Sequence, residues 1–325
     1  MTAISRREFF RKTATNAAVA GFVAAGGARL RANPLGLPIG SQTYPHRARI
    51  QSGEFAALLK DMKALGIEVI ELCSPSYAEF ASLADGKATR KVLDDNGMKC
   101  VSAHFGMNVL RSKQPEMIQW AKDIGMTQMA TASLGGKVTN GMTTLDEVKR
   151  AADEYNKIGA EAKKAGLQQA LHNEGFELSR LEDGRLTYPV LMEYLDPDLV
   201  KMQFQMSSMR TIGDPIMYFT NHPGRFISAH LQGVDTTQGM VASRAGIPPV
   251  KPTPEEAAAA AAGQGRGRGG RGQGGGAVGL AVGEDTVDWP KVFAAAKTGG
   301  IKNYFVEQTW DLTVKSVEYL KTLNV

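Results

Sequence analysis

The chain has 325 residues, of which 43% are hydrophobic, and its formal net charge is +5. A chain of this length and composition can bury a large core, as one barrel-sized domain or as two smaller ones. Residues 1–32 contain six basic residues and one acidic residue, so this short segment accounts for the whole net charge. The remainder is close to neutral, and the composition therefore indicates neither a nucleic-acid partner nor a membrane protein.

The N-terminus has the pattern of a targeting segment. Residues 5–12 contain paired arginines followed by phenylalanines and further basic residues, and residues 13–27 form a short, alanine-rich apolar run. We assign residues 1–32 to a twin-arginine signal peptide, which predicts a periplasmic or otherwise exported protein. The apolar run is too short, and its side chains too small, for stable membrane insertion. The alternative, an amphipathic N-terminal helix, does not account for the order of these features.

From residue 35 onward, strand-like apolar runs alternate with amphipathic helices. The expected strands are 37–44, 67–72, 98–104, 126–131, 167–173, 200–206, 225–230 and 302–307. The expected helices are 54–65, 87–96, 114–124, 145–165, 188–195, 215–221, 288–297 and 314–323. Thr144 and Glu147 form a capping box at the start of the longest helix. Eight such units predict an α/β fold of the (β/α)8 TIM barrel type, as a single domain over residues 35–325. An open, doubly wound sheet is the competing fold, but no glycine fingerprint follows the first strand.

One segment interrupts the alternation after the seventh strand. Residues 236–280 form a low-complexity insertion rich in Gly, Arg, Ala and Pro, which buries too little apolar surface to offset its ordering entropy. We therefore predict a disordered insertion, with a cover over the active-site end of the barrel as the alternative. Arg-Gly runs also occur in segments that bind single-stranded nucleic acid, but no aromatic residues interleave with them here.

The two cysteines, Cys73 and Cys100, fall near the end of one expected strand and the start of the next. At these different levels of a sheet their separation exceeds bonding distance, so we expect two buried thiols rather than a disulfide.

Polar side chains occur at the carboxyl ends of most of the expected strands, which in such a barrel converge on one active-site rim. They are Gln42, Glu71, His104, His172, Asn173, Glu174, Gln205, His230 and Glu307. Imidazole and carboxylate groups together suit a divalent transition metal, which polarises a substrate carbonyl or diol. A further carboxylate can then take a proton from the adjacent carbon. Trp310, just past the last strand, is placed either to stack on a sugar ring or to pack in the core.

Several segments, in this order, resemble one known family. They are 159–177 with its His-Asn-Glu-Gly-Phe-Glu sequence, 195–201, 223–226, 230–231, 282–289 and 304–308. Together they are similar to the sugar phosphate isomerase/epimerase family, which belongs to the xylose isomerase-like TIM barrels and is related to endonuclease IV. The resemblance covers residues 35–325 apart from the insertion.

The resemblance implies a metal, manganese, zinc or cobalt, bound at the ends of the fifth to eighth strands. By position, Glu307 matches the glutamate of strand eight and His230 the histidine of strand seven. His172 stands where many relatives have a ligating glutamate, Asn173 matches the following asparagine, and Glu174 replaces a second histidine. Gln205 stands in place of the strand-six aspartate, and this weakens the site because an amide supplies no charge. The implied ligands are His172, His230 and Glu307, completed by Gln205 or Glu174.

The resemblance also implies proton transfer by paired carboxylates, with Glu174 or Glu307 as the base. We assign Gln42, Glu71, His104, Asn173 and Trp310 to substrate binding. The expected function is that of an exported sugar isomerase or epimerase whose partner is a small-molecule carbohydrate, either a free or an oxidised sugar. Lyase or hydratase chemistry on keto-sugars uses the same groups. The alternative is a non-catalytic carbohydrate-binding barrel that has lost the metal. A nuclease would need a richer ligand set, so no nucleic-acid substrate is expected.

Overall fold

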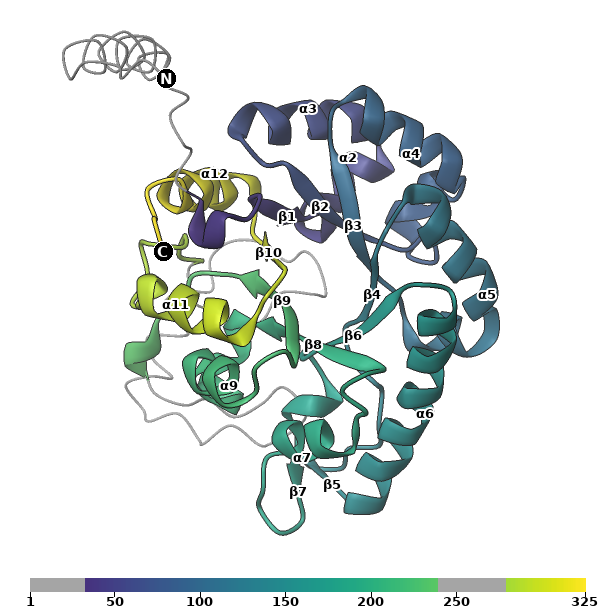
Figure 1. Cartoon of the computed structure of the whole chain (residues 1–325), viewed down its shortest axis with the longest axis vertical. Coiled ribbons are helices and arrows are strands. Elements are labelled where there is room, and N and C mark those ends of the chain that lie inside the picture. The colour runs from purple at the N-terminus through teal and green to yellow at the C-terminus, as the bar shows by residue number, and fades with distance from the viewer. Residues whose placement is uncertain (1–32, 239–278) are drawn as a thin grey trace, which may run out of the picture. The chain divides into compact units, whose positions relative to one another are not determined.

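The computed structural model of the protein describes residues 33–238 and 279–325. In these ranges eight parallel strands close into a barrel, in the order β1-β10-β9-β8-β6-β4-β3-β2 (Figure 1). The strands are β1 (Gly40–Gln42), β2 (Val69–Cys73), β3 (Lys99–His104), β4 (Gln128–Thr131), β6 (Gln168–His172), β8 (Val200–Gln205), β9 (Phe226–Leu231) and β10 (Asn303–Val306). The predicted (β/α)8 barrel is confirmed, and each strand lies within the run predicted for it to within one residue.

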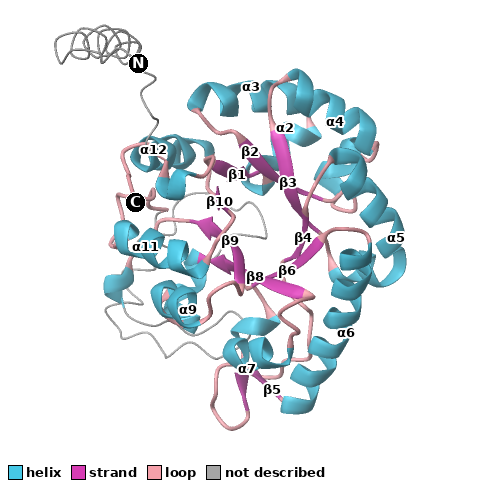
Figure 2. Ribbon diagram, in the orientation of Figure 1, coloured by secondary structure: helices cyan, strands magenta, loops and turns pink. Residues whose placement is uncertain are grey.

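Helices surround the barrel on its outer side (Figure 2). They are α2 (Arg47–Gln51), α3 (Phe55–Leu65), α4 (Gly86–Asp95), α5 (Met107–Ile124), α6 (Leu145–Lys164), α7 (Thr187–Tyr194), α8 (Met209–Ile212), α9 (Pro215–Asn221), α11 (Trp289–Gly299) and α12 (Trp310–Leu320). The described residues also form short 3-10 helices, η1 (Pro34–Gly36), η2 (Tyr44–His46), η3 (Ala78–Leu83), η4 (Phe176–Leu178), η5 (Met206–Ser208) and η6 (Thr236–Gln238). None of the helices in the described ranges is both long and apolar enough to cross a bilayer.

Several local features differ from the prediction. Helix α5 begins seven residues early, at Met107, and is kinked at Lys113, just before a proline within the helix. Helix α12 begins at Trp310 rather than at residue 314. Two short strands, β5 (Met142–Thr143) and β7 (Arg180–Leu181), form a separate two-stranded parallel sheet. A two-residue strand is too short for a periodic pattern to reveal.

The predicted capping box of α6 is half correct. The side chain of Thr144 accepts a hydrogen bond of 3.2 Å from the backbone N of Glu147, as expected for an N-cap. The carboxylate of Glu147 does not return to Thr144 and instead accepts from the backbone N of Lys137 at 2.8 Å. The loop before the helix thus provides a donor that the local motif could not indicate.

The hydrophobic core lies between the barrel and its helices. On the β8 side, the ring of Phe204 packs against Phe219 of α9 with 5.6 Å between the ring centroids, and Phe219 packs against Phe226 of β9 at 5.2 Å. Side chains alternate across a strand, so an outward Phe204 leaves its neighbours Gln203 and Gln205 pointing into the barrel. Packing on α9 thereby fixes which polar side chains of β8 reach the interior.

Two predicted segments lie partly or wholly outside the described residues. The twin-arginine segment, residues 1–32, falls entirely outside them. Of the insertion predicted at 236–280, the structure describes only the 3-10 helix at Thr236–Gln238 and residues 279–280, where Leu280 bridges to Gly233.

Candidate active site

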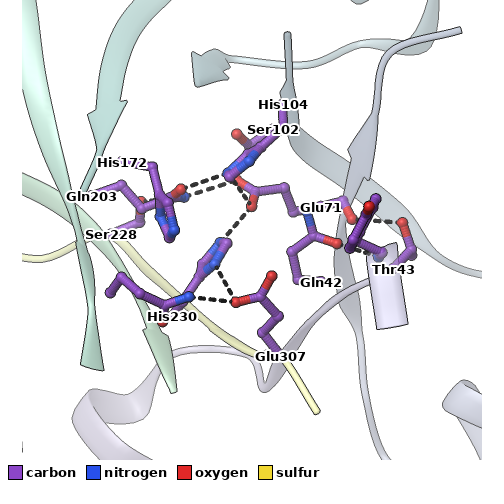
Figure 3. A network of polar contacts seen from close by, with 12 residues as sticks. Gln42, Thr43, Glu71, Ser102, His104, His172, Gln203, Ser228, His230 and Glu307 are labelled. Atoms are coloured by element: carbon purple, nitrogen blue, oxygen red, sulfur yellow. Dashed lines mark hydrogen bonds and ion pairs between the residues drawn. The ribbon is translucent and has the colours of Figure 1, made fainter. Parts of the chain in front are cut away.

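The polar side chains of the strand ends meet at the carboxyl-end rim of the barrel, which we call the mouth. Register places them side by side, because His172 of β6 pairs with Gln203 of β8, and Gln205 pairs with His230 of β9. Figure 3 shows the resulting network, in which side chains from strands distant in the sequence point toward one another.

Glu71 of β2 lies at the centre of this network and is fully buried. Its Oε1 lies 2.5 Å from Nε2 of His230 and 3.2 Å from Nε2 of His104. Its Oε2 accepts a hydrogen bond of 2.8 Å from Nε2 of Gln203. Burial opposes ionisation of Glu71, but the two imidazoles outweigh it and hold the pKa of this carboxyl well below its usual range. Glu71 is therefore a carboxylate that links β2 to β3, β8 and β9.

Glu307 follows β10 and faces the other ring nitrogen of His230. Its Oε2 accepts hydrogen bonds from Nε2 of Gln205 at 2.7 Å and Nε2 of Gln232 at 3.0 Å, and lies 3.2 Å from Nδ1 of His230. Burial opposes ionisation here too, but His230 outweighs it and lowers the pKa of Glu307. With a carboxylate at each ring nitrogen, the pKa of His230 rises to about 10 although burial lowers it. Without an ion, His230 is an imidazolium between two carboxylates.

His172 differs from the other two histidines of the network. It is fully buried, and neither of its ring nitrogens has a hydrogen-bond partner among the described residues. Its ring centroid lies 4.5 Å from that of His230 and 5.0 Å from that of His104. Burial, followed by repulsion from these two rings, holds the pKa of His172 well below its usual range. His172 is therefore a neutral imidazole with an unused lone pair.

Three imidazoles form a set that can bind a metal. One donor nitrogen from each of His104, His172 and His230 lies within 4.8 Å of the other two. We call these three residues the histidine triangle. Three histidines are a common ligand set of catalytic zinc, and carboxylates often orient the ligating rings, as Glu71 does here. An ion would also give a partner to a buried nitrogen of His172. The residues present therefore fit a divalent transition metal.

Only part of the ligand set implied by the family resemblance coincides with the histidine triangle. His172 and His230 belong to the histidine triangle, whereas Gln205 and Glu307 form a second group beside it. Gln205 donates its amide N–H to Glu307, and its buried Oε1 has no partner among the described residues. His104, which the sequence analysis assigned to substrate binding, is in the structure the third member of the histidine triangle.

The remaining predicted site residues lie around the network. The Oε2 atom of Glu174 is 4.0 Å from Nε2 of His172, and its side chain is 55% exposed. Asn173 accepts a hydrogen bond of 2.9 Å from the backbone N of Gln205 and connects the loops after β6 and β8. Gln42 accepts from the backbone N of Tyr44 and donates to Sγ of Cys73 at 3.7 Å.

Trp310 is the first residue of α12 and packs edge-on against His46, with 5.7 Å between the ring centroids. The two cysteines are both buried and unpaired, as predicted. Burial raises the pKa of each thiol, so neither is ionised at neutral pH.

Three residues of the network were not predicted from the sequence. Oε1 of Gln203 accepts a hydrogen bond of 2.8 Å from Nε2 of His104, and Nε2 of Gln203 donates to Oγ of Ser228 at 3.0 Å. Gln232 donates to Glu307. The period-two patterns Gln203–Gln205 and Ser228–His230–Gln232 indicate one face of a strand and could have identified all three.

No family model and no curated protein sequence matches the chain. Solved structures do match it. A sugar phosphate isomerase/epimerase from Parabacteroides distasonis has a TM-score of 0.64 and 17% identity, over 91% of this chain and 96% of the other. AsbF from Bacillus anthracis, a probable 3-DHS dehydratase involved in petrobactin synthesis, has a TM-score of 0.59 and 13% identity, over 89% and 100%. The IOLI protein, determined with a bound zinc atom, has a TM-score of 0.57 and 12% identity, over 89% and 95%. At these identities the likeness shows a shared (β/α)8 barrel fold.

Proposed function

We propose that the chain is an exported, metal-assisted sugar isomerase or epimerase. The observation that carries the proposal is the histidine triangle at the mouth of the barrel, with Glu174 and Glu307 beside it. The comparisons support the proposal, because barrels of the same fold include a sugar phosphate isomerase/epimerase and a zinc-containing protein.

A divalent ion bound by His104, His172 and His230 would polarise a sugar carbonyl or diol and so acidify the adjacent carbon. Among manganese, zinc and cobalt, imidazole donors suit zinc and cobalt better than manganese, which favours oxygen ligands. Glu71 accepts hydrogen bonds from two of the three rings and so fixes their orientation.

Proton transfer falls to the two carboxylates nearest the mouth. Glu174 is half exposed and adjacent to His172, so its carboxylate can reach a sugar and take a proton from the carbon next to the carbonyl. Once protonated, Glu174 can return this proton to the neighbouring carbon, which gives isomerisation. Glu307 lies beyond His230, held as a carboxylate by Gln205 and Gln232, and can take the proton of the adjacent sugar hydroxyl from a second direction. Glu307 can then give that proton to the same carbon from the other face while Glu174 returns its proton to the oxygen, which gives epimerisation.

Elimination begins with the same proton abstraction and hydration is its reverse, and one of the structural neighbours is a probable dehydratase. The substrate class we propose is a free sugar or an oxidised sugar with a carbonyl group.

The test combines metal analysis with a substrate screen. Protein purified from the cytoplasm before export is loaded with zinc, cobalt or manganese and incubated with aldoses, ketoses and 3-keto sugars in D2O. We expect one ion per chain by mass spectrometry and deuterium entering one carbon of a sugar. The double substitution His172→Asn with His230→Asn should abolish metal binding, while the exposed histidine variant His222→Asn should retain it. Unchanged metal content in the double variant would contradict the proposed ligands.

A second function has one observation in its favour. Glu307 already accepts hydrogen bonds from Gln205 and Gln232 and faces an imidazolium, so this part of the network is satisfied without an ion. A non-catalytic carbohydrate-binding barrel is therefore the alternative. Sugar binding without metal uptake or deuterium incorporation would favour it.

Export is part of the proposal. It rests on the paired arginines and apolar run of residues 1–32, and is tested by fusing this segment to a reporter that requires the twin-arginine route. Replacing Arg6 and Arg7 with lysine should leave the reporter in the cytoplasm, whereas replacing Arg29 and Arg31 should not.

A further inference from the structure

Glu177 is a buried carboxylate that the proposed reaction does not use. It lies in η4 (Phe176–Leu178), in the segment after β6, and is fully buried. Its Oε1 accepts hydrogen bonds from the backbone N of Leu134 at 2.7 Å and from Oγ of Ser133 at 3.2 Å. Its Oε2 accepts from the backbone N of Gly175 at 3.1 Å. Two of these donors belong to the loop after β4, so one carboxylate joins two loops of the mouth.

Further hydrogen bonds join the same two loops. Oγ of Ser133 accepts a hydrogen bond of 3.0 Å from the backbone N of Phe176, and the backbone N of Glu174 donates to the carbonyl of Ala132 at 3.2 Å. A Cβ atom at Gly175 would lie only 2.4 Å from Oγ of Ser133. The loops therefore meet at a distance that only glycine permits, and Glu177 supplies the acceptors at that point.

The groups around Glu177 are uncharged. Its carboxylate is stabilised by two backbone N–H groups and one hydroxyl, and the phenols of Tyr155 and Tyr188 are the titratable groups that interact with it from α6 and α7. Burial outweighs the hydrogen bonds and raises the pKa of Glu177 to about 7. A buried carboxylate without a basic partner among the described residues is costly, so the hydrogen bonds of Glu177 to the loop after β4 point to a role other than stability.

We infer that Glu177 is a positioning residue, whose carboxylate fastens the loop after β6 to the loop after β4 and thereby holds Glu174 beside His172. The inference rests on the proposed function, in which Glu174 takes the substrate proton. Glu174 lies three residues before Glu177, and its backbone N is bonded to the same loop after β4. A carboxylate that removes a proton from carbon needs a fixed position, because a displacement of about 1 Å can cost on the order of 100-fold in rate.

The test uses full-length zinc-loaded protein and the variants Glu177→Gln and Ser133→Ala, with Glu182→Gln, which changes an exposed glutamate in the same region, as the matched control. Glu177→Gln places an amide N–H against backbone donors, and Ser133→Ala removes one donor to Glu177 and one acceptor for Phe176. Three quantities are measured: amide hydrogen exchange of residues 132–136 and 173–178, metal content, and kcat and KM for the sugar found in the screen.

We expect exchange in both segments to rise about 10-fold, kcat to fall on the order of 10- to 100-fold, and KM to change less than about 2-fold. Metal content should stay at the wild-type value, because the hydrogen bonds of Glu177 go to Ser133, Leu134 and Gly175 and not to the histidine triangle. Ser133→Ala is the milder change and should raise amide exchange and lower kcat in the same direction. If Glu177→Gln does not fold, Ser133→Ala alone tests the inference.

Two outcomes would overturn the inference: wild-type exchange in both variants, or raised exchange with unchanged kcat. If the wild-type protein turns over no sugar, the proposed function fails, and so does the role of Glu177 in positioning a base. Raised exchange in that case would show only that the carboxylate joins the two loops.

Discussion

Replacing Glu71 with glutamine tests whether the network at the mouth is ionic. The substitution keeps the size of the side chain but removes the charge that faces Nε2 of His230 at 2.5 Å and Nε2 of His104 at 3.2 Å. Both partners are buried, so solvent screens the pair only weakly. Removing one member of a buried ion pair costs about 3–5 kcal/mol, and the lower end applies here because Glu307 still faces Nδ1 of His230.

A loss of that size should lower the melting temperature by roughly 10 °C for a domain of this class. Thermal and urea unfolding of metal-free protein, followed by circular dichroism, measures the effect. The control Glu182→Gln alters an exposed carboxylate and should change the free energy of unfolding by no more than about 0.5 kcal/mol. A loss of less than about 1 kcal/mol in Glu71→Gln would refute the reasoning, because the pair would then be neutral in the folded protein.

Three further substitutions test the fold and a buried acid. Gly40→Ala places a Cβ atom 2.4 Å from the carbonyl oxygen of Tyr304 and should destabilise the closure between β1 and β10 by about 1–3 kcal/mol, whereas Gly106→Ala, with open space at its Cβ position, should be nearly neutral in urea unfolding. Thr144→Ala removes the N-cap of α6 and should cost about 1 kcal/mol in the same assay; a value near zero would show that the cap is dispensable. Burial raises the pKa of Glu177 to about 7, so its contribution to stability is fully present below its unfolded pKa and is lost as the pH rises through about 7. Stability should fall by roughly 3 kcal/mol more between pH 4.5 and pH 7.5 in the wild-type protein than in Glu177→Gln, and parallel pH curves would contradict this.

The architecture was predictable because it depends on local patterns. The strands of the barrel lie at apolar runs with a polar residue at or next to the carboxyl end, such as His230 in Phe226–Leu231, and each long helix repeats its apolar positions with helical period. One error arose where a distant contact decides a local detail. The carboxylate of Glu147 accepts a hydrogen bond from the backbone N of Lys137 instead of completing the capping box. No pattern within the helix indicates this contact, because Lys137 lies in the preceding loop.

The candidate site was predictable only as a set of residues at one rim. His104, His172, His230, Glu71 and Glu307 could each be placed at the end of a strand from the sequence alone, because parallel strands of a barrel share one direction. Which of them touch was decided by register and strand order. These put Glu71 between His104 and His230 and leave the ring nitrogens of His172 without a hydrogen-bond partner in the part of the chain that the structure describes.

The sequence by itself thus determined the kind of chemistry at the mouth, imidazole with carboxylate, through its residue types and their period along each strand. The tertiary structure alone decided the pairing of those groups. It also determined the pKa shifts, because burial and the charge of a neighbour depend on distances between residues more than a hundred positions apart, such as the 2.5 Å between Glu71 and His230. Glu307 illustrates both parts: its place after the last strand follows from the sequence, and its bonds to Gln205 and Gln232 follow only from the closed barrel.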